Sequence, residues 1–189
     1  MKNQRYQKVM KQIHKWMQQD EWQKALDELR LAEKEFPDAA AILTAMGDCQ
    51  IHLIKPEAAV EHFKRVTELE PASVEAFNNL GVAYMFIQNF TQAESAYLHA
   101  LQYMPDHAQT LKNLAFLYYQ QEDRLGDAAT ILAGLVRKYP TDCDALFLMG
   151  QCYEIGSDPA SAAMCYERIL VHQPDSKEAK EALDRINQR

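Results

Sequence analysis

The side chains best suited to metal binding or nucleophilic chemistry are cysteines and histidines, and their spacing favours neither. The four cysteines, Cys49, Cys143, Cys152 and Cys165, form no CxxC pair and have no histidine at zinc-finger spacing. The histidines are scattered along the chain, at positions 14, 52, 62, 99, 107 and 172. The sequence also lacks G-x-S-x-G, H-E-x-x-H and P-loop motifs. We therefore expect no enzymatic activity, no metal and no cofactor, and we expect the cysteines to fill a core.

Composition and charge narrow the classes of partner. The chain has 189 residues, 48% of them hydrophobic and 25% charged, which is typical of a soluble globular protein. Twenty Lys and Arg against 27 Asp and Glu give a net charge of −7, which disfavours nucleic-acid binding. No stretch approaches about 18 uninterrupted apolar residues, and the N-terminus lacks a secretory signal. We expect a cytoplasmic protein that does not insert into a membrane.

An internal repeat is the dominant feature of the sequence. Prolines at positions 37, 71, 105, 140 and 174 are separated by 34, 34, 35 and 34 residues, a period typical of stacked-repeat proteins. Each unit also carries a bulky residue ahead of its proline, and an alanine four residues before that one. The bulky residues are Leu29, Phe63, Tyr97, Leu132 and Tyr166, and the alanines are Ala25, Ala59, Ala93, Ala128 and Ala162.

The first half of each unit has the apolar spacing of one helix face. Phe77, Leu80, Gly81 and Tyr84 stand at i, i+3, i+4 and i+7. The third of these positions is small in four units, as Gly47, Gly81, Ala115 and Gly150. A small residue there lets a second helix approach closely, so each unit is predicted to be a helix pair.

These residues resemble the tetratricopeptide repeat family. The family pattern W-x2-L-G-x2-Y, A-x3-F, P is matched best within residues 74–107, by Phe77, Leu80, Gly81, Tyr84, Ala93, Tyr97 and Pro105. The first unit departs most from it, and the fourth carries one extra residue in its turn. The resemblance implies an all-α, right-handed α-solenoid forming a single domain over 1–189. We place the repeats at 6–39, 40–73, 74–107, 108–142 and 143–176, followed by a capping helix at 177–189.

Helix starts follow from local chemistry. Lys55-Pro56 and Asp158-Pro159 place proline in a first helical turn, where its missing N–H is harmless. Asp20, Asp38 and Asp106 are expected to cap the helices that follow them. The run Asp175-Ser-Lys-Glu178 has the spacing of a capping box that opens the final helix.

The face of each first helix opposite its core positions is apolar where the repeat's own packing does not require it. In the last three repeats it carries Val82, Phe86, Phe116, Leu148 and Ile155. In the first two repeats it reads Gln7, Lys11, His14, Gln18 and then Ala41, Ala45, Asp48, His52, which is more polar. If first helices line the inside of the solenoid, as in the family, these faces form a concave groove that is apolar toward its C-terminal half. Such a patch is typical of a partner site.

Polar residues accompany this apolar face. Asn79 and Asn113 are equivalent residues one repeat apart, near Lys112. Amides can hold a peptide backbone, and the pair resembles the asparagine ladders of peptide-binding family members; alternatively these amides cap turns or face water. Lys11 and Lys112, which have two whole repeats between them, are the only basic residues on that face. This departs from the family members that clamp a carboxylate, so we do not expect chaperone-tail binding.

The sequence therefore predicts a non-enzymatic adaptor or chaperone-like module that binds a peptide segment of a protein partner. The predicted peptide-binding residues are Asn79, Val82, Phe86, Lys112, Asn113, Phe116, Leu148 and Ile155. An alternative is a scaffold that forms homo-oligomers through the apolar groove or the terminal helix. A narrower variant is a secretion chaperone, similar to the small, acidic class II translocator chaperones, although five repeats are more than those usually have.

Overall fold

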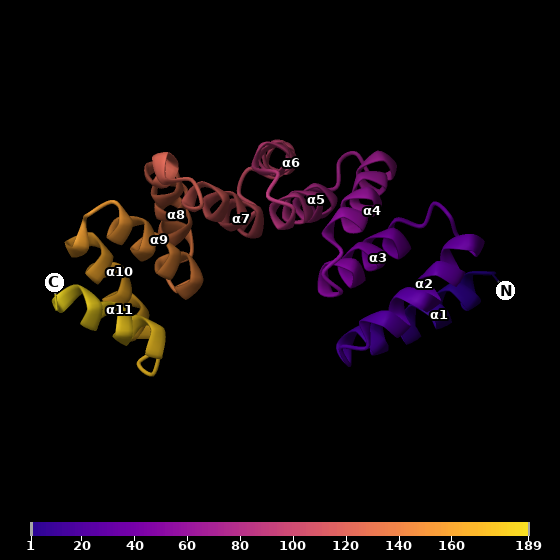
Figure 1. Cartoon of the computed structure of the whole chain (residues 1–189), viewed down its shortest axis with the longest axis horizontal. Helices are drawn as coiled ribbons and strands as arrows, with labels where there is room; N and C mark the ends of the chain where they lie inside the picture. Colours follow the sequence, from indigo (N-terminus) through magenta and orange to yellow (C-terminus); the bar gives the residue numbers. More distant parts are fainter. Residues whose placement is uncertain (1, 189) are drawn as a thin grey trace. The chain divides into compact units, whose positions relative to one another are not determined.

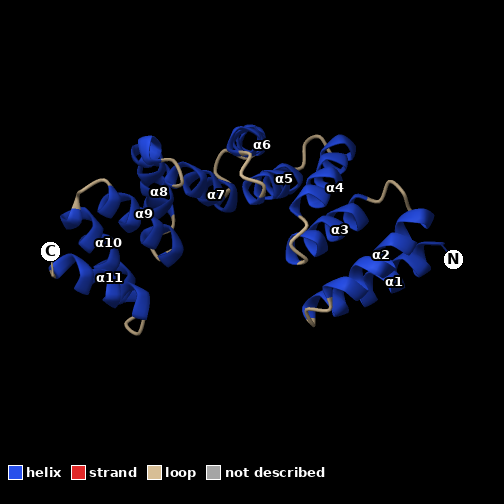
Figure 2. Cartoon of the chain, in the orientation of Figure 1, coloured by secondary structure: helices blue, strands red, loops and turns tan. Residues whose placement is uncertain are grey.

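The computed structural model describes residues 2–188, which fold entirely into helices and short connections (Figures 1 and 2). The helices are α1 (Lys2–Gln18), α2 (Trp22–Glu35), α3 (Ala40–His52), α4 (Pro56–Leu69), α5 (Val74–Phe86), α6 (Phe90–Tyr103), α7 (Ala108–Tyr119), α8 (Leu125–Lys138), α9 (Cys143–Ile155), α10 (Pro159–His172) and α11 (Lys177–Asn187). A short 3-10 helix, η1 (Glu122–Arg124), precedes α8. The all-α prediction is confirmed.

The helices fall into two compact units. Unit 1 ends at Pro105 and contains α1 to α6, and unit 2 begins at Asp106 and contains α7 to α11. Within each unit every helix packs against the next one in the chain. The five helix pairs coincide with the five predicted repeats, and the two units hold three and two of them. The expectation of a single domain over the whole chain stays a prediction.

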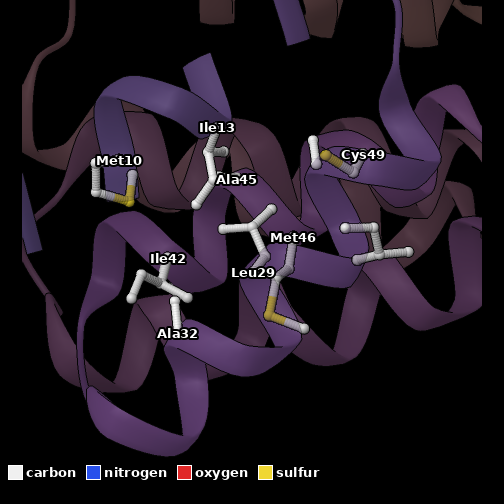
Figure 3. Close-up of a cluster of buried hydrophobic side chains, with 10 residues drawn as sticks. Met10, Ile13, Leu29, Ala32, Ile42, Ala45, Met46 and Cys49 are labelled. Carbon is white, nitrogen blue, oxygen red and sulfur yellow. The ribbon is translucent and has the colours of Figure 1, made fainter. Parts of the chain in front are cut away.

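The core of each unit lies between helices that are consecutive in the chain. Figure 3 shows the cluster at the start of unit 1, where side chains from the first two repeats meet. Its members include Met10, Ile13, Leu29, Met46 and Cys49, all buried. The cluster therefore joins one repeat to the next as well as the two helices within a repeat.

A glycine facing an aromatic ring sets the approach of the two helices in three repeats. A Cβ added to Gly47 would lie 2.6 Å from the Phe63 ring, and one added to Gly150 would lie 2.6 Å from the Tyr166 ring. Gly81 meets the Tyr97 ring in the same way. Real side-chain carbons essentially never come closer than 3.0 Å, so these positions cannot hold even alanine without a shift. The rings are buried and cannot swing away.

The two remaining repeats use smaller partners. The fourth has Ala115 and Leu132 at the equivalent positions, and the first has Ile13 and Leu29, all fully buried. A larger residue on the first helix thus accompanies a smaller one on the second. In both repeats, side-chain volume on the first helix takes the place of an aromatic ring on the second.

Left-handed backbone recurs at the turn inside the repeats. Asp20, Ile54, Gln88 and Ser157 have φ between 56° and 60°, and they occupy equivalent positions in four repeats. The fourth repeat instead carries its extra residue and η1 at this point. The turn is therefore the same in every repeat that keeps the standard length.

Three of the predicted caps are wrong. The residues preceding α2, α3 and α7 are Glu21, Ala39 and His107, and none makes a side-chain cap bond. Asp20 is in the left-handed turn, and Asp38 and Asp106 instead pair with Arg65 and Lys138 from the second helix of the next repeat. These carboxylates link neighbouring repeats at the surface.

Other helix starts match local chemistry. Asp158 accepts a hydrogen bond from the Ser161 N–H at 3.1 Å, with Pro159 in the first turn of α10, as predicted. The cap of α11 is Ser176, whose Oγ accepts from the Ala179 N–H, one residue later than the Asp175 capping box predicts. A hydroxyl at this position satisfies one of the open N–H groups of the helix.

One carboxylate ties α11 to the last repeat. Glu154 of α9 accepts a hydrogen bond from the Tyr166 hydroxyl at 2.8 Å and from the Arg185 guanidinium at 2.9 Å. Burial, followed by this hydrogen bond to Glu154, raises the pKa of Tyr166 far above its usual value. The phenol therefore stays protonated and keeps donating to Glu154, which also binds α11 through Arg185. The role of α11 as a capping helix stays a prediction.

The glycine contact gives a stability prediction. Gly81→Ala should lower the free energy of unfolding by about 1 to 3 kcal/mol, because the new methyl group overlaps the Tyr97 ring. Adding Tyr97→Leu, which copies the alanine–leucine pair of the fourth repeat, should restore part of the loss. Gly134→Ala is the matched control: nothing lies within 4 Å of its added Cβ, so it should stabilise by about 0.5 to 1 kcal/mol. Chemical denaturation measures the free energy of unfolding of all three variants. A stabilised Gly81→Ala would contradict the close contact between Gly81 and the Tyr97 ring.

The left-handed turn gives a second prediction. Ile54 is β-branched and 88% exposed, so its side chain gains little from burial while its backbone conformation costs about 1 to 2 kcal/mol. Ile54→Asn should therefore raise the free energy of unfolding by about 1 kcal/mol, since asparagine tolerates this conformation. Val171→Asn replaces another exposed β-branched residue, in helix α10, and should bring no gain. An unchanged melting temperature for Ile54→Asn would show that the turn is not strained.

Candidate functional site

In unit 1 the predicted site residues lie along one face of α5. Asn79 and Val82 are half-buried and Phe86, one turn further, is 58% exposed. The Asn79 Oδ1 accepts a hydrogen bond of 3.5 Å from the amide of Asn78, which is itself buried. Phe86 is thus an aromatic ring that the described residues leave largely uncovered, as the sequence predicts.

A hollow of about 200 Å³ adjoins this face of α5 within unit 1. It is lined by Met17, Trp22, Asp48, Ile51, His52, Phe63, Asn79 and Val82. The Trp22 indole stacks on the His52 imidazole with ring centroids 3.7 Å apart and planes 1° apart. Trp22 begins α2 and His52 ends α3, so the stack joins the first two repeats.

Asp48 supplies the carboxylate of this hollow. Its side chain is half-buried, and burial raises its pKa above the usual value, while the charge of His52 acts in the opposite direction. Met17, Trp22 and Val82 line the hollow together with Asp48, and burial of a carboxylate disfavours its charged form. Unit 1 therefore combines one poorly solvated acid with aromatic and aliphatic walls.

In unit 2 the predicted residues divide between two helices. On α7, Phe116 is 45% exposed and stacks against Tyr119 with centroids 6.1 Å apart. On α9, Leu148 is half-buried and Ile155 is 50% exposed. Both helices are the first of their repeats, and these three apolar side chains remain accessible in unit 2.

The polar residues of α7 have partners inside unit 2. The Lys112 ammonium lies 3.1 Å from the Asp142 carboxylate, which also caps α9 by accepting from the Ala145 N–H. Asn113 accepts a hydrogen bond of 3.0 Å from the Gln109 amide. Lys112 is therefore an ion-paired side chain that helps to fix α7 against the start of α9.

A second hollow, of about 500 Å³, lies beside these helices in unit 2. Phe116 and Leu148 line it, together with Phe147, Ile169 and the acids Asp144 and Glu178. The thiol of Cys143 also faces it, and Gln151, Gln173 and Ser176 complete the lining. Lys112, Asn113 and Ile155 are outside this lining, so the hollow includes only some of the predicted residues of unit 2.

Sequence comparison agrees with this helical arrangement. Sequence models of the tetratricopeptide repeat family match residues 53–108, 78–142 and 144–176, which is well over half of the chain. This chain belongs to the tetratricopeptide repeat family. Members of the family are in general binding proteins without catalytic activity, which agrees with a protein-interaction module.

Two relatives contain matching sequence within much longer proteins. The human protein O-mannosyl-transferase TMTC3 is 30% identical over 147 residues, which are 77% of this chain and 16% of that protein. Cellulose synthase operon protein C of Komagataeibacter xylinus is 26% identical over 164 residues, 77% of this chain and 12% of that protein. The tetratricopeptide chain thus spans less than a fifth of the length of these relatives.

Solved structures share the fold at low sequence identity. PilF of Pseudomonas aeruginosa has a TM-score of 0.84 at 15% identity, covering 99% of this chain and 85% of its own. MamA has a TM-score of 0.75 at 21% identity, covering 91% and 92%. YrrB, described as a tetratricopeptide protein with an unusual peptide-binding site, has a TM-score of 0.73 at 16% identity, covering 93% and 90%. The predicted tetratricopeptide solenoid fold is confirmed.

Sequence reasoning missed part of each tetratricopeptide hollow. It placed Asp48 and His52 on the polar part of the face, whereas both line an aromatic hollow with Trp22. It placed Ala45 on the open face, whereas Ala45 is buried in the core. In unit 2 it omitted Phe147 and Glu178. The available signal was Trp22, a large aromatic residue outside the repeat pattern at the start of a second helix.

No membrane-spanning helix and no metal cluster occur among the described residues. None of the helices is at once long enough and apolar enough to cross a bilayer. No group of three or more His, Cys, Asp or Glu side chains in the same part of the chain could hold a metal ion. The arrangement offers surfaces for apolar, aromatic and charged contacts.

The cysteines give a testable prediction. Cys49, Cys152 and Cys165 are buried as expected, and burial raises the pKa of each thiol to about 11. Cys143 is only half-buried, unlike a core residue, although burial and its aspartate neighbours raise its pKa as well. At pH 8 we expect iodoacetamide to modify Cys143 first and the other three only on unfolding, because the thiolate is the reactive form. The rate of modification should therefore show one rapidly reacting thiol in the folded protein, and Cys143→Ser should remove it. Rapid modification of two or more thiols would contradict the assignment of Cys143 as the accessible cysteine.

The same pKa shifts predict a loss of stability in alkali. Since the folded state holds these protons more tightly than the unfolded chain does, the stabilisation is complete below about pH 9 and is lost as the pH rises to about 11.

Proposed function

We propose that this chain is an adaptor or chaperone-like module that binds a peptide segment of a partner protein on the faces of its first helices. The observation that carries the proposal is the exposure of aromatic rings on those faces, Phe86 in unit 1 and Phe116 in unit 2. Full burial of one such side chain by a partner yields about 1.5 to 3 kcal/mol, which contributes to the affinity of the complex.

The other predicted residues have supporting roles in this proposal. Val82, Leu148 and Ile155 extend the apolar contact, and Asn79 and Asn113 supply amides that can bond to a peptide backbone. Lys112 acts mainly through its ion pair with Asp142, which holds α7 and α9 in place. The likeness to YrrB, a protein described as having a peptide-binding site, is in line with this assignment.

We further propose that the chain acts without catalysis or cofactor, in the cytoplasm, and on protein partners in preference to nucleic acid. The net charge of −7 disfavours a polyphosphate partner. The part of the human O-mannosyl-transferase that matches is 16% of its length, and the matching residues of this chain fold as repeats, so we assign binding to them. Four free thiols are in line with a reducing compartment.

The proposal predicts the outcome of charge insertion. Peptides selected from a random library on the wild-type chain should bind the Phe86→Glu, Phe116→Glu double variant at least tenfold more weakly, because a carboxylate replaces an apolar contact. Fluorescence anisotropy measures the affinity. The melting temperature should change little, since both rings are largely exposed.

Leu98→Glu is the matched control. Leu98 is as exposed as Phe116, at 45%, but lies on the second helix of its repeat. Its substitution should leave peptide binding unchanged. Equal affinities of the wild type and the double variant would refute the proposed surface.

Light scattering across a dilution series tests the alternative, self-assembly. A monomer at every concentration supports the binding module. Concentration-dependent association that the double variant abolishes would instead assign the same rings to contacts between copies of the chain.

A further inference from the structure

The hollow of unit 1 places a single carboxylate among largely apolar walls. Of the eight described residues that line it, only Asp48 and His52 have titratable side chains. His52 also stacks on Trp22. Within the described part of the chain, the Asp48 carboxylate has no hydrogen bond or salt bridge, and His52 is its electrostatic neighbour.

The charge of His52 favours the Asp48 carboxylate less than burial disfavours it. A half-buried carboxylate loses part of its hydration, and burial is the main cause that raises the pKa of Asp48. A cation brought in by a ligand would give the carboxylate a direct ion pair, which it does not have among the described residues, in a poorly hydrated site. The charge of the hollow therefore favours a positively charged occupant.

The walls suit a cation carried on an aliphatic stem. Met17, Ile51 and Val82 provide apolar surface for methylene groups. The volume of about 200 Å³ greatly exceeds the roughly 30 Å³ of one water molecule, so the hollow has room for a long side chain.

We propose that this hollow binds a lysine or arginine side chain of the partner's peptide segment, with its charge paired to Asp48 and its stem against Met17, Ile51 and Val82. This inference rests on the proposed function, because it gives the bound segment a required residue. It also places a contact that determines specificity in the N-terminal half of the chain. The open faces of the first helices are more polar there than in the C-terminal half.

Nuclear magnetic resonance titration tests the hollow without knowledge of the partner. The probes are Nα-acetyl-lysine amide and Nα-acetyl-arginine amide, with Nα-acetyl-norleucine amide as the control that keeps the stem and lacks the charge. The readout is the indole N–H signal of Trp22. Trp16, the only other tryptophan in the sequence, is outside the lining and serves as internal reference.

We expect saturable shifts of the Trp22 signal with the two cationic probes and at least tenfold weaker binding of the norleucine probe. Asp48→Asn, which keeps the shape of the side chain, should weaken the cationic probes at least tenfold. Asp144→Asn removes an acid from the hollow of unit 2 and should have no effect on this signal. Equal binding of the lysine and norleucine probes, or unchanged binding by Asp48→Asn, would overturn the proposal.

The outcome is separable from that of the proposed function. The selected peptides could depend on Phe86 and Phe116 for binding and yet show no enrichment of lysine or arginine. If Asp48→Asn also left their affinity unchanged, the cation site alone would be refuted. Failure of every peptide to bind would refute the proposed function, while the probe titration would still decide whether the hollow binds a cation.

Discussion

The contact between a glycine on the first helix and an aromatic ring on the second is the constraint that sets the packing of the second, third and fifth repeats. At Gly47, Gly81 and Gly150 the opposing ring occupies the space of a side chain, so the helices can approach only because no side chain is there. This contact uses one face of the first helix entirely for packing. The opposite face is left to solvent or to a partner, and Phe86 and Phe116 lie there.

Electrostatic contacts act on a smaller scale than this packing. Surface pairs such as Arg65 with Asp38 link repeats but are well exposed, so each contributes little to stability. Contacts that fix helix ends are more protected, as with Lys112 and Asp142 at the start of α9 and with Glu154 beneath α11. The charges therefore mostly determine where helices begin and how the last one is held, after apolar packing has set the stack.

Much of the fold could be predicted from the sequence because the same motif, weak in any one unit, recurs in phase in five repeats. The spacing of Pro37, Pro71 and their equivalents, with Gly81 and Tyr97 in phase, predicts the helix pairs and the close contact that the structure contains. Caps were less predictable, because a capping aspartate and a turn aspartate are the same residue type, and only the backbone of Asp20, at φ 56°, distinguishes them.

The site was predictable only where one helix face determines it. The exposure of Phe86 and Phe116 follows from helical phase alone. The hollow of unit 1 requires side chains from five helices to meet, and the Trp22–His52 stack depends on how one repeat sits on the next. Local periodicity carries no information on that placement, so the sequence pattern predicts Asp48 to be a solvent-exposed acid.

The recurring turn has a consequence for how this chain tolerates change in length. Four turns bend through one residue with left-handed backbone, and the fourth repeat accommodates an additional residue at the same point while its helices still pair. An insertion there is absorbed locally and does not move the glycine out of register with its ring. These bends are thus natural places to graft an epitope or a fluorescent tag, and at one of them Ile54 is almost wholly in solvent.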